Sequence, residues 1–234
     1  MPPDKHAPDR SAGVPPAGAR ASRPRFGEVT VRNRGRLPHW EMESGWYFVT
    51  FRLCDSLPEH VLAELEEQTK RARLTKKHDP ELLRTIEKYL DRGTGSCWLR
   101  RPEIASVVAD AILHLHGKKW RMLAWVVMPN HVHLVFRLLP GHSLAGTLHS
   151  LKSFTSEKAN AVLQRRGGFW QREYYDHLLR GEGSLDKAVR YVLTNPERAG
   201  LKNWEWIGDL TVELPEPPRA GGTRPSRRDA GATP

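Results

Sequence analysis

Two adjacent apolar runs, residues 122–128 and 131–138, constrain the fold of this 234-residue chain more than any other feature. Only Pro129 and Asn130 separate them. A short turn-forming break between two apolar runs predicts neighbouring strands joined by a tight turn. The chain is therefore expected to contain an antiparallel sheet that includes this hairpin.

The second run carries two histidines two residues apart. Because side chains alternate across a strand, His131 and His133 point to one face, while Val132, Leu134 and Phe136 point to the other. We expect the apolar face to pack under helices and the histidine face to stay open. Two imidazoles that lie side by side can both bind one divalent cation. Ordinary strand histidines give the same pattern, so the pair alone leaves both interpretations open.

The remaining elements follow from periodicity and from glycine and proline boundaries. The aromatic and β-branched run 46–53 predicts a buried strand, and the aromatic run 169–179 predicts a fourth strand. Apolar stripes at helical spacing predict helices over residues 82–90, 104–115, 144–162 and 185–194. The resulting order predicts an α+β fold, a ferredoxin-like antiparallel sheet with helices packed on one face.

The length suits one domain of ordinary size. Residues 1–28 and 211–234 are rich in Pro, Gly and Arg and poor in large apolar side chains, a composition that predicts disordered basic tails. The domain is expected to cover residues 29–210. Its first and second strands are separated by a helical insertion, residues 55–118.

Composition narrows the class of function. The 37 Lys and Arg residues outnumber the 27 Asp and Glu residues, and the formal net charge of +10 favours a polyanionic partner, nucleic acid first. No run approaches the roughly 18 apolar residues of a membrane span, and the N-terminus lacks the apolar stretch of a secretory signal. The two cysteines form no Cys-x-x-Cys pattern, so neither a disulfide framework nor a thiolate zinc site is indicated. We expect a cytoplasmic protein without a membrane partner.

The last predicted helix carries a tyrosine away from its apolar stripe. At about 100° per residue, Tyr191 lies roughly 140° from the centre of that stripe. Asn195 follows one turn later and can share the same side, and Pro196 is expected to end the helix. The pair is therefore expected to lie away from the core. It suits either a functional tyrosine and amide or a surface tyrosine with an asparagine cap.

Four short motifs, taken in order, resemble the REP-associated tyrosine transposases. They read WVVMPNHVHLV at 125–135, LKSFT at 151–155, FWQREYYDH at 169–177 and YVLTNPERAGL at 191–201. An opening stretch, GRLPHW at 35–40, also resembles the family. The resemblance covers about residues 30–205. The segment 55–118 is long for a minimal single-tyrosine transposase, although a helical insertion there resembles one subgroup.

The resemblance implies a His-hydrophobic-His single-tyrosine transposase. Such an enzyme cleaves and rejoins single-stranded DNA, at hairpins or repeat ends, through a 5′-phosphotyrosine intermediate. The tyrosine four residues before Asn-Pro in the family pattern is the nucleophile, and it maps to Tyr191. The amide one turn later maps to Asn195, which would bind the metal together with His131 and His133. Ligands of this kind favour Mg²⁺ or Mn²⁺.

Several neighbouring residues are further site candidates. Tyr174 and Tyr175 compete for the role of nucleophile, although we expect them to position DNA or to complete the sheet. His177 is equally a candidate for an extra metal ligand, a DNA contact or a surface residue. Phosphate contacts are predicted for Lys152, Arg172 and Arg190. Whether the protein is a monomer or a homodimer stays open.

Two other classes of function fit the same sheet. A ferredoxin-like nucleic-acid-binding module would act without catalysis, although the sequence has no RNP1-like run. A metal-dependent nuclease would use water and need no tyrosine. A covalent protein–DNA adduct separates the transposase from both, because only the tyrosine route leaves one.

Overall fold

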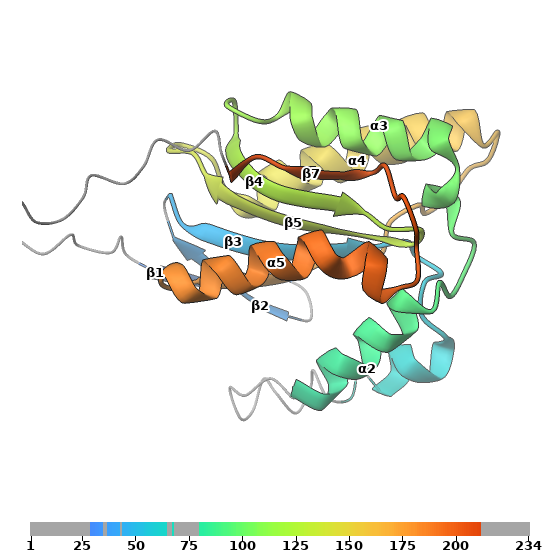
Figure 1. The fold of residues 1–234 in the computed structure, drawn as a ribbon, viewed down its shortest axis with the longest axis horizontal. Coiled ribbons are helices and arrows are strands. Elements are labelled where there is room, and N and C mark those ends of the chain that lie inside the picture. Colours follow the sequence, from blue (N-terminus) through green and yellow to red (C-terminus); the bar gives the residue numbers. More distant parts are fainter. Residues whose placement is uncertain (1–28, 35–36, 43, 65–66, 68–79, 212–234) are drawn as a thin grey trace, which may run out of the picture.

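The computed structural model describes residues 29–34, 37–42, 44–64, 67 and 80–211 (Figure 1). The two predicted tails lie outside the described residues, apart from Thr211. Among the described helices, none combines the length and the apolar character that a membrane span requires.

A five-stranded antiparallel sheet forms the centre of the molecule, with the strand order β6-β3-β5-β4-β7. Its first four strands follow the ferredoxin-like order, which confirms the predicted fold class. The bounds are β3 Trp46–Arg52, β4 Trp120–Val127, β5 His131–Leu138, β6 Tyr175–Leu179 and β7 Ile207–Asp209. β3, β4 and β5 match the predicted runs closely.

Three differences from the predicted strands concern the edges of the structure. The run 169–179 forms a strand only from Tyr175 onward, and Trp170 makes an isolated bridge to Leu53. β7 was not predicted, and it extends the sheet beside β4. A separate two-stranded sheet pairs β1 (Val29–Arg34) with β2 (Leu37–Met42).

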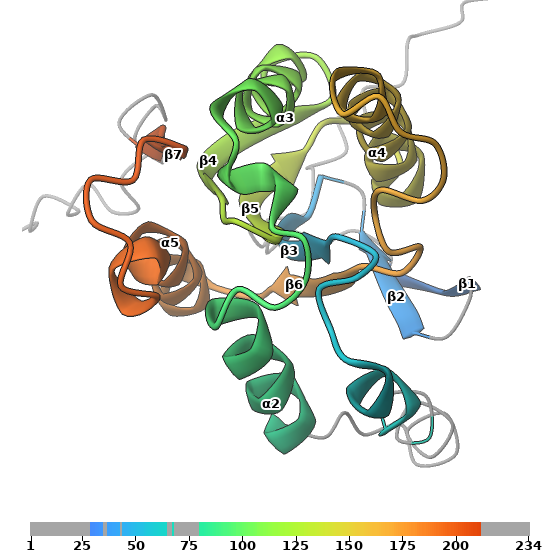
Figure 2. The same cartoon turned by 90° about the vertical axis from the view of Figure 1, so that its right-hand side faces the viewer.

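Helices cover both faces of the sheet (Figure 2). α3 (Pro102–His114) and α4 (Leu144–Val162) pack on the face that carries Val132, Leu134 and Phe136, as predicted. α5 (Glu182–Arg198) packs on the opposite face, so the prediction of helices on one face is wrong for α5. The reason is that the second face is also apolar: it presents side chains that pack with α5, among them Ala124, Val126, Val135 and Leu179.

α5 also continues past the residue predicted to end it. Pro196 lies inside its last turn, where the missing proline N–H removes a single hydrogen bond close to the helix end. Gly200, two residues past the last helical residue Arg198, closes the helix end with a φ of +73°. There the Leu201 and Gly200 amides donate to the Pro196 and Glu197 carbonyls, the pairing of a Schellman motif. Asn195 is thereby kept in helical geometry.

The predicted helical insertion between β3 and β4 is confirmed. It includes a helical stretch at 59–64, α2 (Pro80–Asp91) and a short 3-10 helix at Trp98–Arg100, before α3 begins. α2 lies on the α5 side of the sheet, and its C-terminal end comes beside α5 in both views (Figures 1 and 2). The insertion therefore reaches the face that carries the histidines.

The loop after α2 is fixed between two other segments. The Thr94 carbonyl accepts a 2.9 Å hydrogen bond from the buried side chain of Asn130, in the β4–β5 turn. Gly95 has a φ of +90°, and a Cβ there would overlap the carbonyl of Asp55. Both the backbone angle and the close approach require glycine at this position.

Replacing Gly95 by alanine is expected to lower the free energy of unfolding by about 2 kcal/mol, because backbone strain and overlap with Asp55 add together. Gly117→Ala is the matched control. Its φ of +73° is similar but its surroundings are open, so it should lose only about 1 kcal/mol. Urea unfolding measures both variants. Equal losses would show that the Gly95 loop moves freely.

Candidate active site

The two histidines of β5 lie side by side, as their spacing predicts. Their ring centroids are 4.6 Å apart, and the two Nε2 atoms face each other at 3.0 Å. The prediction of an open histidine face is wrong, however, because His131 is 0% and His133 2% exposed. Cover from α5 removes these imidazoles from water.

Each histidine is held through its Nδ1 atom. His131 Nδ1 lies 2.7 Å from Asn130 Oδ1, and His133 Nδ1 lies 2.7 Å from Thr50 Oγ1. The Asn130 amide nitrogen donates to the Thr94 carbonyl, so its Oδ1 must accept from His131. The proton of neutral His131 is therefore on Nδ1, and its Nε2 offers a lone pair.

Thr50 allows either neutral tautomer of His133, because its hydroxyl can donate or accept a hydrogen bond. When Thr50 donates to Nδ1, the His133 Nε2–H can donate to His131. When Thr50 accepts, both Nε2 lone pairs point at the same place. Second-shell hydrogen bonds of this kind orient metal-ligating histidines.

Burial keeps both imidazoles neutral. It lowers the pKa of His131 to about 3, against a small opposing effect of the Asn195 amide. It also lowers the pKa of His133 well below the usual value, and electrostatic interaction with His131 and Arg198 lowers it further. Neutral imidazole is the form that binds metals.

Asn195 lies deep in the interface between α5 and the sheet, with 0% exposure, so the prediction that it lies away from the core is wrong. Its amide lies close to His131, yet neither amide atom makes a hydrogen bond of normal geometry to a described residue. Such an unsatisfied buried amide is costly and requires an explanation. Two imidazole nitrogens and an amide oxygen are a donor set that can bind a divalent cation.

Among the described residues, carboxylates and thiolates do not form a ligand group with the two histidines. Within the described part of the chain, no group of three or more His, Cys, Asp and Glu residues is arranged to hold a metal ion. The unsatisfied polar side chain that lies beside His131 is the Asn195 amide.

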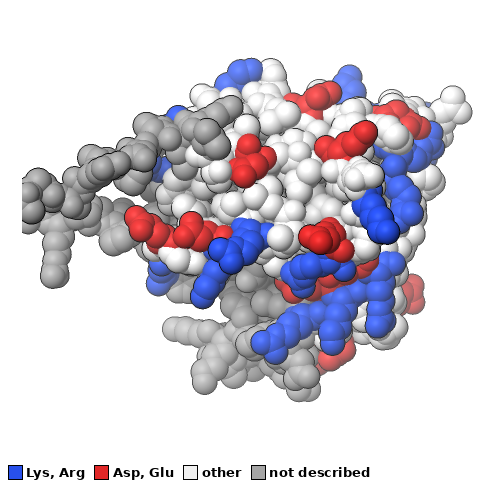
Figure 3. All heavy atoms as spheres, in the orientation of Figure 1, with Lys and Arg blue, Asp and Glu red and all other residues white. Residues whose placement is uncertain are grey.

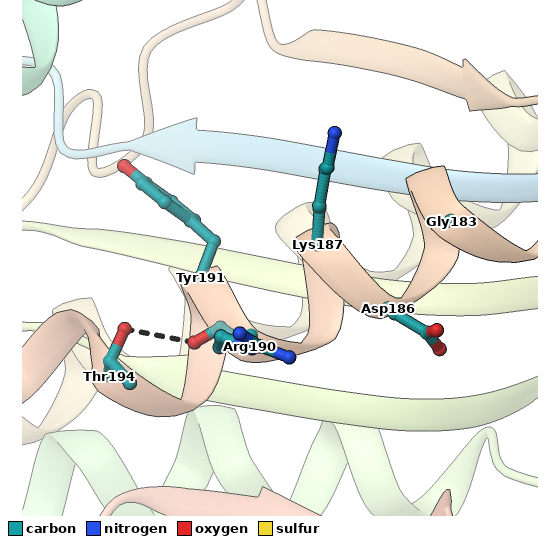
Figure 4. Close-up of a pocket in the computed structure, with 6 residues that line it drawn as sticks. All are labelled: Gly183, Asp186, Lys187, Arg190, Tyr191 and Thr194. Carbon is teal, nitrogen blue, oxygen red and sulfur yellow. Dashed lines mark hydrogen bonds between the residues drawn. The ribbon is translucent and has the colours of Figure 1, made fainter.

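Tyr191 extends from α5 towards β3 (Figure 4) and lies next to the histidines. Its ring meets those of His133 and Phe48 nearly edge-on, at centroid distances of 5.3 and 5.7 Å. The buried contacts of α5 centre on Ala188 and Val192, so Tyr191 is at the border of the helix–sheet interface. The structure thus brings together His131, His133, Asn195 and Tyr191.

Charged groups that the motifs did not indicate surround the Tyr191 phenol. Burial raises its pKa, and the negative charges of Glu87 and Asp91 raise it further. Arg198 opposes this shift, with its guanidinium 5.0 Å from the centre of the Tyr191 ring. The two carboxylates come from α2, about 100 residues away in sequence, and nothing in a local pattern could have associated them with Tyr191.

Tyr174 and Tyr175 occupy different surroundings. Tyr175 pairs with Thr50 across β6 and β3 and so shares the histidine face, but its nearest ring contact is with Phe48 at 6.4 Å. Tyr174 packs against the core on the α3 and α4 side. Apart from His131, the described aromatic rings that contact His133 are Phe48 and Tyr191.

A groove on the exposed side of α5 leads to Tyr191. It is lined by Gly183, Asp186, Lys187, Arg190, Tyr191 and Thr194. Lys187 leaves the helix on the same side as Tyr191 (Figure 4), and basic side chains gather along α5 and between α5 and α2 (Figure 3). Arg190, for which a phosphate contact was predicted, therefore lines this groove together with Lys187.

The other predicted contacts are distributed elsewhere. The Lys152 ammonium donates to the carbonyls of Gln171 and Arg172 at 2.7 and 2.9 Å, and burial lowers its pKa to about 8. Lys152 thus anchors the 171–174 segment to α4. Arg172 is exposed, and His177 is exposed on β6 beside Phe48, outside the group formed by the histidine pair, Asn195 and Tyr191.

Comparison with known proteins finds similarity to transposases. Residues 102–195, from the start of α3 to Asn195 in α5, match the family described as Transposase IS200 like. A curated Haemophilus influenzae protein, provisionally named REP-associated tyrosine transposase, is 27% identical over 109 residues. The match covers 39% of this chain and 62% of that relative.

Two solved structures match this chain at 15% sequence identity. One is a REP-associated tyrosine transposase bound to a REP hairpin, with a TM-score of 0.44, 72% of this chain and 79% of that chain being covered. The other is a provisionally named transposase of Deinococcus radiodurans, with a TM-score of 0.33 and coverage of 70% and 96%.

The resemblance indicated by the four motifs is confirmed by the family match and by the curated relative. Residues 102–195 are similar to the IS200-like transposases, and the chain resembles a REP-associated tyrosine transposase.

Proposed function

We propose that this protein cleaves and rejoins single-stranded DNA, at hairpins or repeat ends, through a covalent bond between Tyr191 and a 5′-phosphate. The observation that carries the proposal is the contact between the Tyr191 ring and His133, within a group that also contains His131 and the unsatisfied Asn195 amide. The similarity to IS200-like transposases supports a DNA substrate, and so does the net charge of +10.

His131, His133 and Asn195 would hold a Mg²⁺ or Mn²⁺ ion. When bound, this ion would supply Lewis-acid stabilisation of the charge that develops on the scissile phosphate. Asn130 and Thr50 would keep the two Nε2 lone pairs directed at the ion.

Tyr191 supplies the nucleophile. Its hydroxyl oxygen bonds to phosphorus, the bond from phosphorus to the 3′-oxygen breaks, and the DNA is left with a free 3′-hydroxyl. The phosphotyrosine bond conserves the energy of the phosphodiester, so a 3′-hydroxyl can reverse the step without ATP. The open groove beside Tyr191, with Lys187 and Arg190 on its wall, suits the backbone of an unpaired strand.

Tyr191→Phe is expected to abolish the adduct and to slow cleavage by about 10⁴-fold or more, because it removes the attacking oxygen and keeps the ring. The measurement is a denaturing gel of protein incubated with Mg²⁺ and a labelled single-stranded hairpin. A fully paired duplex should remain uncut. Tyr174→Phe, in the core, is the matched control and should cleave normally.

The peptide that carries the nucleotide decides the assignment of the nucleophile. Mass spectrometry of the trapped wild-type adduct should locate the nucleotide on Tyr191. Attachment to Tyr175, which shares the histidine face, would preserve the reaction class and overturn the assignment. Cleavage that leaves no adduct would indicate a nuclease that uses water.

Removal of the hydrogen bond between Thr50 and His133 tests the proposed metal site. Thr50→Val leaves His133 Nδ1 without its partner and is expected to weaken Mn²⁺ binding by about 10- to 100-fold. Thr194→Val is the matched control, since that hydroxyl donates to the Arg190 carbonyl within α5. Calorimetric titration measures both, and His131→Ala should bind no Mn²⁺ at the site. Unchanged affinity in the Thr50 and His131 variants would refute a histidine-held metal.

A further inference from the structure

Arg52 is a buried cation on the histidine-bearing face of the sheet. It is the last residue of β3 and pairs directly with His131 of β5. The two side chains therefore leave the sheet on the same face, as those of the next pair, Thr50 and His133, do. Arg52 lies outside the residues that match the transposase family, and the reaction proposed above assigns it no role.

The charge of Arg52 is enclosed without an acidic partner. The residue is only 8% exposed, and no carboxylate of the described residues forms an ion pair with it. Of its five N–H donors, one is used, in a 3.2 Å hydrogen bond from Nη1 to Ser56 Oγ. Burial lowers the pKa of Arg52 to about 10, the sign of an unfavourable surrounding for a cation. Such an arginine is expected to meet an anion that is not part of the described chain.

The unused edge of the Arg52 guanidinium can reach such an anion. Neither Nε nor Nη2 donates to a described residue, and neither is among the fully enclosed polar atoms that lack a partner. Both atoms therefore keep some contact with solvent, although the residue as a whole is buried. The Nε and Nη2 donors lie side by side on one edge of the guanidinium, which is the arrangement that binds two oxygens of a phosphate.

Hydrogen bonds on both sides hold Arg52 in place. The buried Ser56 hydroxyl donates to the Leu53 carbonyl at 2.8 Å, so its oxygen is fixed where it accepts from Arg52. The Arg52 carbonyl accepts a 2.8 Å bond from the Gln171 amide, and the Lys152 ammonium donates to the Gln171 carbonyl at 2.7 Å. A guanidinium that is already oriented loses less freedom when it binds.

The histidine pair lies between Arg52 and the proposed nucleophile. The Tyr191 ring contacts His133 and Phe48, which is near the start of β3. Arg52, at the end of β3, is beside His131 instead. In an in-line displacement the attacking and leaving oxygens are on opposite sides of phosphorus. With the scissile phosphate at the histidine pair and Tyr191 on one side, the 3′-oxygen leaves towards Arg52.

We propose that Arg52 binds a backbone phosphate of the strand that ends in the free 3′-hydroxyl after cleavage, an assignment that rests on the proposed function of Tyr191. The Nε–H and Nη2–H groups donate to two oxygens of this phosphate, while Nη1 keeps its bond to Ser56. The contact holds the cleaved strand at the site, so that its 3′-hydroxyl can attack the phosphotyrosine in the rejoining step.

The first test measures the affinity of the full-length protein for a labelled single-stranded hairpin, without divalent metal so that the strand stays uncut. Arg52→Gln is expected to weaken binding by about 10- to 100-fold, the effect of losing a charge-assisted contact. Arg52→Lys keeps the charge but not the paired donors and should have an intermediate affinity. Arg166→Gln makes the same change at an exposed position after α4 and should bind as the wild type does.

The melting temperature separates a binding residue from a structural one. Arg52→Gln removes a buried charge that has no acidic partner, so its melting temperature should equal or exceed that of the wild type. An arginine that served only to hold the end of β3 would give a lower melting temperature in the same variant.

The second test locates the phosphate. A methylphosphonate replaces one charged oxygen of a single phosphate by a methyl group, and it is placed in turn at each position on either side of the cleavage site. One such change on the 3′-hydroxyl side should weaken wild-type binding by about tenfold. It should have no further effect on Arg52→Gln, because both changes remove the same contact.

Four outcomes would each overturn the inference: wild-type affinity of Arg52→Gln, a lowered melting temperature, additive effects of the two changes, or coupling to a phosphate on the other side of the cleavage site. Adduct formation by the wild-type protein with Mn²⁺ tests the proposed function separately. Coupling in a protein that forms no adduct would retain the phosphate contact of Arg52 and overturn the proposed chemistry.

Discussion

The packing of α5 on the histidine-bearing face of the sheet is the interaction on which the rest of the site depends. Ala188 and Val192 meet the apolar side chains of β4 and β5 there, and this contact closes the face over His131 and His133. Burial then makes the imidazoles neutral, brings Asn195 beside them and places Tyr191 at the border of the interface. A single apolar contact therefore sets both the geometry and the protonation state of the site.

The packing of α5 on the sheet also buries polar groups, which lowers the stability of the fold unless these groups form hydrogen bonds. Asn130 and Thr50 satisfy the Nδ1 atoms of the histidines from the β4–β5 turn and from β3. The Asn195 amide has no comparable partner among the described residues, and the two Nε2 atoms face each other. The unsatisfied Asn195 amide lies beside His131, and the proposed divalent-ion site rests on this arrangement.

Periodicity in the sequence predicted most of the helices and strands, because each has a clear apolar stripe or run with a glycine or proline boundary. It could not predict which face of the sheet α5 would cover, since a stripe shows that a helix is buried but not against what. β7 has three residues, too few for a periodic signal. The family pattern identified His131, His133, Tyr191 and Asn195. Asn130 lay inside a quoted motif, but its role appeared only when the Thr94 carbonyl fixed the orientation of its amide.

The residues missed altogether, Glu87 and Asp91, show where reasoning from local patterns ends. Alternation in a strand can place two histidines on one face, and helical spacing can place Asn195 one turn after Tyr191, because both relations are local. The relation between α2 and α5 is set by tertiary packing between segments about 100 residues apart. Tyr191, Asn195 and Arg198 share α5, whereas the histidines come from β5 and the carboxylates from the insertion. The complete set exists only when all three parts of the fold are assembled, so an insertion that leaves the sheet unchanged can still alter the chemistry of the tyrosine.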